Sequence, residues 1–414
     1  MEYSVSLLNI KSILSKLKAG DKVWLEDGSH NNLNVKIDCK GSLKSRITIK
    51  AKNPGKVILT GNIKINLSGS YTTLANIVMK DGGVENSIEI RGKGNRLCGC
   101  DISLNNSNGP VLMIYPKFNR IDHCYFHDYS KSDRWIQKDP NSKSEDYILI
   151  DHNVIKNRKQ GRGNGFETIQ LRNEDNKIKS KSIILENSFE KCDGEIEMIS
   201  VKSSDNIIAN NTINSCKATI TLRSGFSNYV VNNKFLQNNV DESGGIRVTG
   251  ENHIIKNNLF KEINGGDSTG CAISIISKPQ YQQVKKLQII NNVFINNECD
   301  LGLGIGKGNL PPTDIVFINN IFYKTSKNPI FSKKGSDCNN LVFNNNEYYA
   351  SNIGENKKDV GVLQSPSKFD KSRINENIYG NTEKCGILWD VEPETLDINI
   401  ELDSYYEETK KKLL

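Results

Sequence analysis

Short apolar runs recur along the chain, and each ends in an Asn with an aromatic or β-branched residue two positions later. One copy reads Ile184-Leu185-Glu186-Asn187-Ser188-Phe189, and another reads Ile255-Lys256-Asn257-Asn258-Leu259-Phe260. Other copies occupy residues 150–155, 208–213, 231–235, 290–294 and 318–322. Successive Asn positions are 22 to 34 residues apart, and a repeat of that length predicts a solenoid with one coil per copy.

Polar and apolar positions alternate within each copy, and Gly, Asn, Ser and Asp separate the copies. This alternation predicts strands, and amphipathic segments with helical spacing are almost missing. We therefore expect an all-β fold, a right-handed parallel β-helix over residues 21–350. The repeated Asn suits the bends between strands, because Asn tolerates the left-handed conformation and can bond turn backbone groups coil after coil. The Phe two residues later should point into the core and stack there.

Both ends of the chain depart from the repeat. Ser6 to Leu17 has helical spacing, which predicts an amphipathic helix that covers the first coil within an N-terminal cap over residues 1–20. From about residue 351 the repeat is lost, and residues 351–414 are expected to form an irregular extension or cap. Its last part, Tyr405 to Lys412, predicts a helix or a frayed tail.

Composition narrows the classes of function. No apolar run approaches the roughly 18–20 residues of a membrane span, so no membrane association is expected. Residues 1–8 do not read as a signal peptide; either the protein is not exported by that route or a leader was removed, and the location stays open. The net charge of +7 is spread along the chain without a dense Lys/Arg block before its last residues. This argues against a nucleic-acid partner and suits an acidic polymer, although solubility alone would also explain it.

Cysteine usage predicts no disulfide framework and no zinc ribbon. The ten cysteines are thinly spread and form no pair of CxxC motifs. We expect buried, reduced thiols that pack as small apolar groups.

Several charged and polar residues fall at matched positions of neighbouring repeats. Counted from the repeated Asn, one strand of successive coils should carry Asn164, Glu197, Arg223 and Arg247, with Glu195 on the same face as Glu197 and Lys202 beyond the next bend. Coils stack about 4.8 Å apart, so these side chains should form one cluster. An amide oxygen and two carboxylates suit Ca²⁺ better than Zn²⁺. The plain alternative is a solvated face on which Lys and Arg neutralise the acids.

These residues resemble polysaccharide lyase family 6, which includes alginate lyases and chondroitinase B. The resemblance covers about residues 15–350 and is carried by Asn164-Gly165-Phe166-Glu167-Thr168-Ile169, Glu195-Ile196-Glu197, Ile199-Ser200-Val201-Lys202, Thr221-Leu222-Arg223 and Gly244-Gly245-Ile246-Arg247. The chain departs from the family at Ser224, where His is common, and at Phe166, where a second Gly is common.

The resemblance implies a role for each matching residue. Asn164, Glu195 and Glu197 would bind Ca²⁺, Lys202 would be the catalytic base, and Arg223 would be the acid or charge-stabilising partner. It also suggests substrate contacts at Arg247, Glu167 and His123, although His123 could instead pack against its turn. His253 would be structural.

The implied reaction is β-elimination on a 1,4-linked polyuronate, an anionic polysaccharide, with alginate favoured by the Gly-Gly-Ile-Arg segment. A dermatan sulfate lyase with the same machinery and a non-catalytic glycan-binding β-helix are the alternatives. A glycoside hydrolase would need a dedicated pair of carboxylic acids, and the acids here fit a metal site. Oligomeric state and cutting mode stay open, with residues 128–148 and 264–287 as candidate groove-closing insertions.

Overall fold

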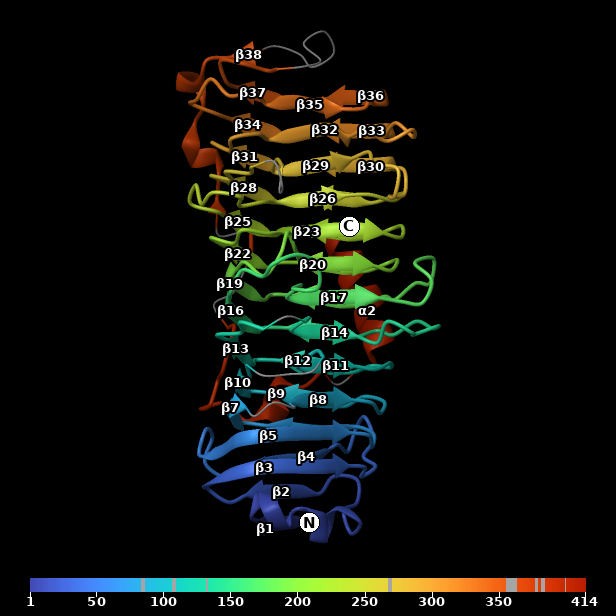
Figure 1. Cartoon of the computed structure of the whole chain (residues 1–414), viewed down its shortest axis with the longest axis vertical. Helices are drawn as coiled ribbons and strands as arrows, with labels where there is room; N and C mark the ends of the chain where they lie inside the picture. The colour runs from blue at the N-terminus through green and yellow to red at the C-terminus, as the bar shows by residue number, and fades with distance from the viewer. Residues whose placement is uncertain are drawn as a thin grey trace.

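Equivalent positions of successive repeats stack directly on one another in the computed structural model. Ile150 pairs with Ile184, and Ile184 pairs with Ile208, always in parallel register. The coils therefore form the predicted right-handed parallel β-helix, a column with the N-terminus at one end (Figure 1). The structure describes residues 1–82, 86–105, 109–131, 133–266, 270–354, 363–376, 379–380, 384–398 and 400–414.

Each regular coil contributes one strand to sheet A and two to a second sheet, whose strands form rows B1 and B2. Sheet A contains β1 Glu2–Val5, β2 Lys22–Leu25, β4 Ile47–Ala51, β6 Thr72–Ala75, β9 Arg96–Cys98, β12 Arg120–Asp122, β15 Leu149–Asp151, β18 Ile183–Leu185, β21 Ile207–Ala209, β24 Tyr229–Val231, β27 Ile254–Lys256, β30 Lys285–Ile290, β33 Thr313–Ile318 and β36 Asn339–Asn344. Row B1 contains β7 Val78–Gly82, β10 Asp101–Ser103, β13 Tyr125–His127, β16 Val154–Arg158, β19 Ser188–Cys192, β22 Thr212–Asn214, β25 Lys234–Leu236, β28 Leu259–Lys261, β31 Val293–Ile295, β34 Ile321–Tyr323, β37 Glu347–Tyr349 and β38 Leu363–Gln364. Row B2 contains β8 Ser87–Ile90, β11 Leu112–Ile114, β14 Ile136–Lys138, β17 Ile169–Arg172, β20 Glu197–Lys202, β23 Thr219–Ser224, β26 Ile246–Val248, β29 Ile273–Ile276, β32 Leu301–Gly306 and β35 Phe331–Gly335. The long strands β3 Gly28–Ile37 and β5 Val57–Leu67 span both rows.

A ladder of buried asparagines lines the turn between sheet A and row B1. Asn211 Nδ2 donates to Asn233 Oδ1 at 2.9 Å, and Asn233 Nδ2 donates to Asn258 Oδ1 at 3.1 Å. The left-handed residue is the one before the ladder position, for example Asn232 with φ 57°. The predicted ladder is therefore present, but the bend and the ladder belong to two successive residues. The Phe residues two positions after the ladder stack in the core, as Phe235 and Phe260 do at 4.8 Å.

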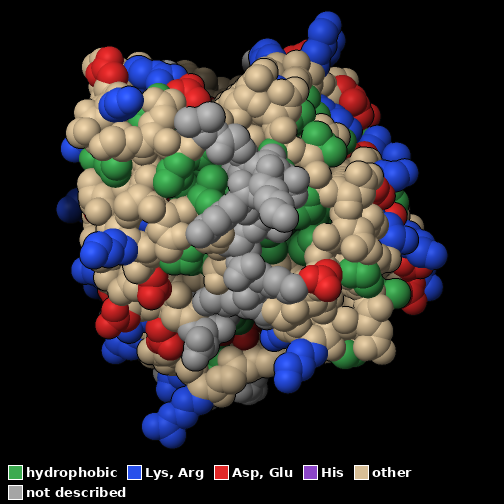
Figure 2. All heavy atoms as spheres, turned by 90° about the horizontal axis from the view of Figure 1, so that it is seen from above, with side chains coloured by type: hydrophobic (Ala, Val, Ile, Leu, Met, Phe, Trp, Pro, Cys, Tyr) green, Lys and Arg blue, Asp and Glu red, His purple; other side chains and the backbone are tan. Residues whose placement is uncertain are grey.

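The N-terminal cap is shorter and less helical than the predicted helix over 6–17. A 3-10 helix, η1 Leu7–Asn9, and a single turn, α1 Lys11–Leu14, follow β1, which already pairs with β2. Leu7, Ile10, Leu14 and Leu17 are nevertheless buried in the main core, so the apolar positions were identified correctly. Seen from above, the other end of the column shows hydrophobic side chains within a rim of charged ones (Figure 2).

The described parts of residues 365–414 run back along the outside of the column and are called the strap (Figure 1). The strap contains η2 Pro366–Lys368, η3 Lys371–Arg373, η5 Pro393–Leu396 and α2 Leu402–Leu413. It reaches the first coils, where Glu392 and Glu394 pair with Lys50 of β4. From there α2 returns to the middle of the column (Figure 1) and covers apolar outer positions of sheet A. None of the described helices is long and apolar enough to cross a membrane.

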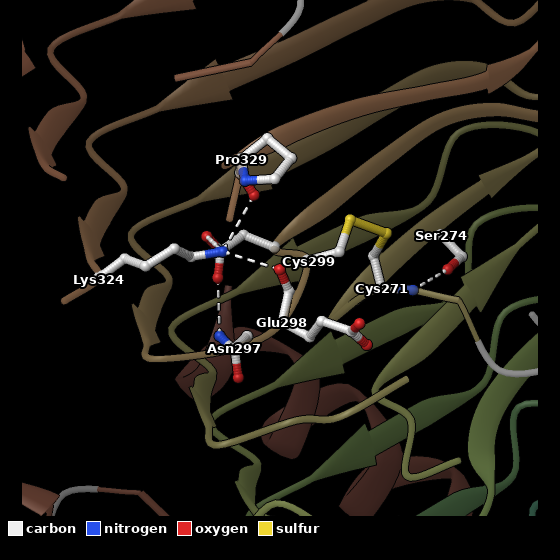
Figure 3. The surroundings of a disulfide bond; sticks show 8 residues. Cys271, Ser274, Asn297, Glu298, Cys299, Lys324 and Pro329 are labelled. Carbon is white, nitrogen blue, oxygen red and sulfur yellow. Dashed lines mark hydrogen bonds and ion pairs between the residues drawn. A yellow bond between two sulfur atoms is a disulfide. The ribbon is translucent and has the colours of Figure 1, made fainter. Parts of the chain in front are cut away.

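One disulfide contradicts the expectation that all cysteines are reduced. Cys271 and Cys299 are joined at 2.05 Å (Figure 3). They lie in the turns that precede β29 and β32, so the bond ties neighbouring coils together. The repeat pattern did not reveal this pair, because these turns differ in length from coil to coil. Cys39, Cys98, Cys100, Cys124, Cys192 and Cys216 are buried thiols, as predicted.

Candidate active site

Three neighbouring strands of row B2 carry most of the predicted site. Glu197 begins β20 and Lys202 ends it, Arg223 lies on β23, and Arg247 lies on β26. The strands are in register, with Ser200 opposite Thr221 and Thr221 opposite Arg247. The cluster predicted across coils is therefore present. Lys202, however, lies on the same strand as Glu197 and not beyond a bend.

Two β-bulges aim the charged side chains. At Met198 the pairing of β20 with β23 shifts by one residue, so Met198 and Ile199 both face the core. The shift changes the alternation and lets Glu197 face outward together with Lys202. A second shift makes Arg223 the extra residue of β23. Bulges of this kind re-aim side chains near functional sites.

Glu195 and Asn164 reach the site from turns and not from strands. Glu195 lies in the bend before β20, which differs from the predicted position on one strand face with Glu197. The bend is tight, because a Cβ at Gly194 would come within 2.1 Å of the Phe166 carbonyl oxygen. Asn164 is exposed in the segment before β17. Both residues line the same cleft as the three strands.

Three carboxylates meet beneath this cleft. Glu167, Glu195 and Glu197 each offer an oxygen within 4.8 Å of the other two. Glu167 Oε1 accepts a hydrogen bond from Gln170 Nε2 at 2.7 Å. Glu197 Oε2 accepts one from Ser200 Oγ at 2.6 Å. Glu167 is fully buried, so it belongs to the carboxylate cluster and is not an open surface for a substrate.

Two oxygens of this cluster, Glu195 Oε1 and Glu167 Oε2, are buried without a hydrogen bond among the described residues. Burial, and then the charges of Glu167 and Glu197, raise the pKa of Glu195 to about 8. A divalent cation would reverse this effect, since it favours the ionised carboxylates. Three oxygen-bearing acids with an unsatisfied buried atom fit a hard cation such as Ca²⁺.

Lys and Arg side chains surround the acids. Lys202 Nζ lies 3.4 Å from Glu167 Oε1, and Arg223 Nε lies 3.1 Å from Glu197 Oε1. An Arg247 nitrogen lies 3.8 Å from the same Glu197 oxygen. Lys202 and Arg223 are 23% and 29% exposed, whereas Arg247 is 8% exposed. The first two can therefore meet a ligand, whereas Arg247, which also lines the cleft, is the most buried of the three.

The cleft above the cluster has a volume of about 670 Å³. Sequence reasoning missed several lining residues from turns that vary between coils, among them Lys217, Glu242, Lys278 and Tyr281. The Tyr281 ring lies under the Arg223 guanidinium, at 3.9 Å from its centre. Arg134, which was also missed, lies 3.3 Å from Glu167 Oε2.

Two predicted histidines lie outside the cleft. His123 is buried at the turn after β12, where Nδ1 bonds Asp122 Oδ2 at 2.8 Å and the ring stacks on His152. The structure thus gives it the packing role and not the substrate contact. Cys98 lies beside this pair, but Asp122 is already held by Arg96, so a metal there would compete with a guanidinium.

His253 has the structural position expected of it. Its Nδ1 accepts from the Asn228 amide and its Nε2 donates to the Thr249 carbonyl, which makes it a rung in line with Asn206 and Asn228. Burial lowers its pKa to about 4, so the ring is neutral.

Comparisons with known proteins support one family. The family model described as Chondroitinase B matches residues 5–388. The solved structure of the PL6 family alginate lyase AlyGC has a TM-score of 0.81 and 24% identity, over 95% of this chain and 60% of that chain. A mannuronic acid specific polysaccharide family 6 lyase from human gut microbiota has a TM-score of 0.71 and 24% identity, over 83% and 86%.

A third similar structure is the PL6 family polysaccharide lyase Pedsa3628 from Pseudopedobacter saltans. It has a TM-score of 0.72 and 21% identity, over 92% of this chain and 99% of that chain. At these identities the structures share the β-helix fold with this chain. No curated protein sequence matches this chain.

Proposed function

Because the chain belongs to polysaccharide lyase family 6, the family of the chondroitinase B model, we propose that it cleaves 1,4-linked polyuronates, alginate foremost, by β-elimination. The observation that carries the proposal is the meeting of Lys202, Arg223 and three carboxylates in one cleft. A cleft lined by both cations and clustered acids suits a substrate whose carboxylate must be bound and whose neighbouring carbon must lose a proton.

In the proposed reaction, the Lys202 amine removes the C5 proton of the uronate in the cleft and becomes protonated. The electron pair forms the C4–C5 double bond, the C4–O4 bond breaks, and the departing O4 takes up a proton from water. Arg223, which is partly exposed beside Lys202, stabilises the negative charge that develops. General-base assistance of this kind contributes about 10²–10⁴-fold. The product carries a 4,5-unsaturated uronate at its new end.

We assign a calcium site to Asn164, Glu195 and Glu197, with Glu167 in the same carboxylate cluster. The support is the packing of three acids within 4.8 Å and the unpartnered Glu195 oxygen. A bound Ca²⁺ supplies positive charge for a substrate carboxylate, which makes the adjacent C–H bond more acidic. Ser200 and Gln170 hold the Glu197 and Glu167 carboxylates in place through their hydrogen bonds.

The test follows ultraviolet absorbance of the new double bond on alginate, polymannuronate, polyguluronate and dermatan sulfate, with and without a chelator. We expect activity on alginate that chelation abolishes, and a fall of at least about 10²-fold in kcat for Lys202→Ala. Lys191→Ala is the matched control, because Lys191 is an exposed residue of β19 outside the cleft.

The outcomes separate the candidates. Absorbance on dermatan sulfate alone would favour the chondroitinase B-like alternative, which the family model also matches. Absence of activity on every uronate would overturn the lyase proposal. For the metal, isothermal titration should show calcium binding in the wild type that is lost in Glu197→Gln, whatever the activity of either protein.

A further inference from the structure

A loop that starts two coils beyond β23 reaches back over the cleft. Residues 277–284 connect β29 to β30, and β29 pairs with β26, which in turn pairs with β23. From this loop Gln282 Oε1 accepts a hydrogen bond from the Gly225 amide at 2.7 Å. Tyr281 places its ring under Arg223 at 3.9 Å. The loop thus crosses one coil and contacts β23 and the residue that follows it.

The base of the loop is tied down on the side away from the cleft. Ser277 Oγ donates to the Leu310 carbonyl at 3.2 Å, and Gln283 Nε2 donates to the Pro311 carbonyl at 2.6 Å. Within the loop, the Tyr281 amide bonds the Lys278 carbonyl at 3.0 Å. These bonds hold the base of the loop in place. Tyr281 and Gln282 therefore contact the cleft from a segment whose base is fixed.

Arg223 has few other contacts to hold it. It is the extra residue of a bulge and is 29% exposed, and its ion pair among the described residues is the one with Glu197 Oε1. Glu197 also belongs to the proposed calcium site, and a cation there would weaken its attraction for a guanidinium. The stacking of the Arg223 guanidinium on an aromatic ring does not depend on the Glu197 charge, so it would persist with a cation bound.

We propose that Tyr281 is a positioning residue for Arg223, and that Gln282 seats the loop by holding the backbone beyond Arg223 at Gly225. The inference rests on the proposed lyase function and deepens it. The ring holds the guanidinium on one face of the cleft. Arg223 is then already placed to contact the negative charge that develops on the substrate and does not have to change rotamer. Tyr281 acts through its ring, and its hydroxyl takes no part in the proton transfers.

The test compares Tyr281→Leu with Tyr281→Phe on the substrate that the wild type cleaves. We expect Tyr281→Leu to lower kcat by about tenfold with KM changed less than about threefold, since a stacked cation contributes on the order of a tenfold effect. Tyr281→Phe should retain kcat within about threefold, because it keeps the ring. Gln282→Ala, which leaves the ring intact and removes only the bond to the Gly225 amide, should cause a smaller fall in kcat.

Tyr115→Leu is the matched control. The Arg91 guanidinium lies at a similar distance from the Tyr115 ring centre, 4.0 Å, and also donates to the Tyr115 hydroxyl at 2.9 Å, at a position that does not line the cleft. We expect it to leave both kcat and KM unchanged. Thermal melting of each variant, read by circular dichroism, should remain close to wild type, because Tyr281 and Gln282 lie at the surface.

Three results would overturn the positioning role. Wild-type kcat in Tyr281→Leu would show that the ring is dispensable. A rise in KM alone would make Tyr281 a substrate-binding surface. Equal losses in the Phe and Leu variants, with a pH profile altered in both, would assign the effect to the hydroxyl. An inactive wild type on all uronates would refute the proposed function itself, which is a different outcome from any of these.

Discussion

His152 illustrates at the residue scale how the column stabilises a charge. Its Nδ1 donates to Asp151 Oδ2 at 2.8 Å, and its Nε2 lies 2.7 Å from Glu186 Oε2. Burial opposes the charged ring, but the two carboxylates outweigh burial and raise the pKa of His152 to about 9. An unfolded His has a pKa near about 6.5. The folded chain therefore binds this proton more tightly than the unfolded chain does.

This shift predicts a pH-dependent contribution to stability. The contribution is fully present below about pH 6.5 and is lost as the pH rises through about 9. We expect His152→Gln to be less stable than wild type by about 1–2 kcal/mol at pH 6, and the gap to close toward pH 10. Urea unfolding across this range measures it.

The pKa of His253 is shifted in the opposite direction, which gives a comparison with His152. Its pKa is lowered to about 4, so its contribution is present above about pH 6.5 and is lost as the pH falls toward 4. The gap between wild type and His253→Gln should therefore shrink in acid. A gap that is flat with pH for both variants would contradict the assigned charges.

At the scale of elements, the asparagine ladder determines how one coil joins the next. Asn233 Nδ2 donates to the carbonyls of Ile208 and Val231, and its Oδ1 accepts from the Asn211 amide at 3.0 Å. All these groups are buried, so each needs a partner. The residue before it, Asn232, provides the left-handed bend, and its backbone bonds the Lys256 carbonyl and the Gly380 amide. Two adjacent asparagines thus have different structural roles.

The two roles can be separated by mutation. Asn233→Ala should lower the free energy of unfolding by about 3 kcal/mol or more, because it leaves a buried amide and two carbonyls without their partner. Asn232→Gly should change it by less than about 0.5 kcal/mol, because glycine adopts a positive φ without strain. Denaturant unfolding with both circular dichroism and fluorescence measures the effect. Similar losses in the two variants would contradict this division of roles.

The same elements explain what the sequence could predict. The β-helix and the Asn and Phe stacks follow from short patterns that repeat from coil to coil, so they could be predicted from the sequence alone. The strand positions of Glu197, Arg223 and Arg247 were close to correct because these residues lie on repeat strands, whereas Lys202 was wrongly placed beyond a bend. The bend at Glu195 and the two bulges were not predictable, because each changes the alternation by one residue at one coil. Tyr281 and the Cys271–Cys299 bond lie in turns without a repeat, where spacing carries no information about neighbours.

At the scale of the whole molecule, the strap joins parts of the column that are far apart in sequence. Lys50 of β4 is buried against Glu392 and Glu394, and Arg96 donates to the Pro393 carbonyl at 2.7 Å. At the other end of the return path, Tyr406 of α2 is buried and donates to Asp205 at 2.8 Å. The strap therefore packs along the column and buries residues on its outer surface.

Tyr406 is the anchor on which the docking of α2 depends. We expect Tyr406→Ala to raise amide hydrogen exchange throughout Leu402–Leu413, with a loss of about 3–5 kcal/mol in local stability, since a large buried aromatic is removed. Exchange in row B2 should change little. Glu408→Ala, an exposed position on the same helix, is the control and should exchange like wild type. Unchanged protection of α2 in Tyr406→Ala would show that the helix is held elsewhere.

The strap also changes the order in which the protein can be completed during synthesis. In a plain solenoid each coil depends only on its neighbours, so folding can spread from the first coils as they leave the ribosome. Here the partners of Lys50 lie 342 and 344 residues later in the chain. The coils made first therefore acquire their outer contacts last. Until the strap has been synthesised, the Lys50 site and an apolar stripe of sheet A stay open to solvent.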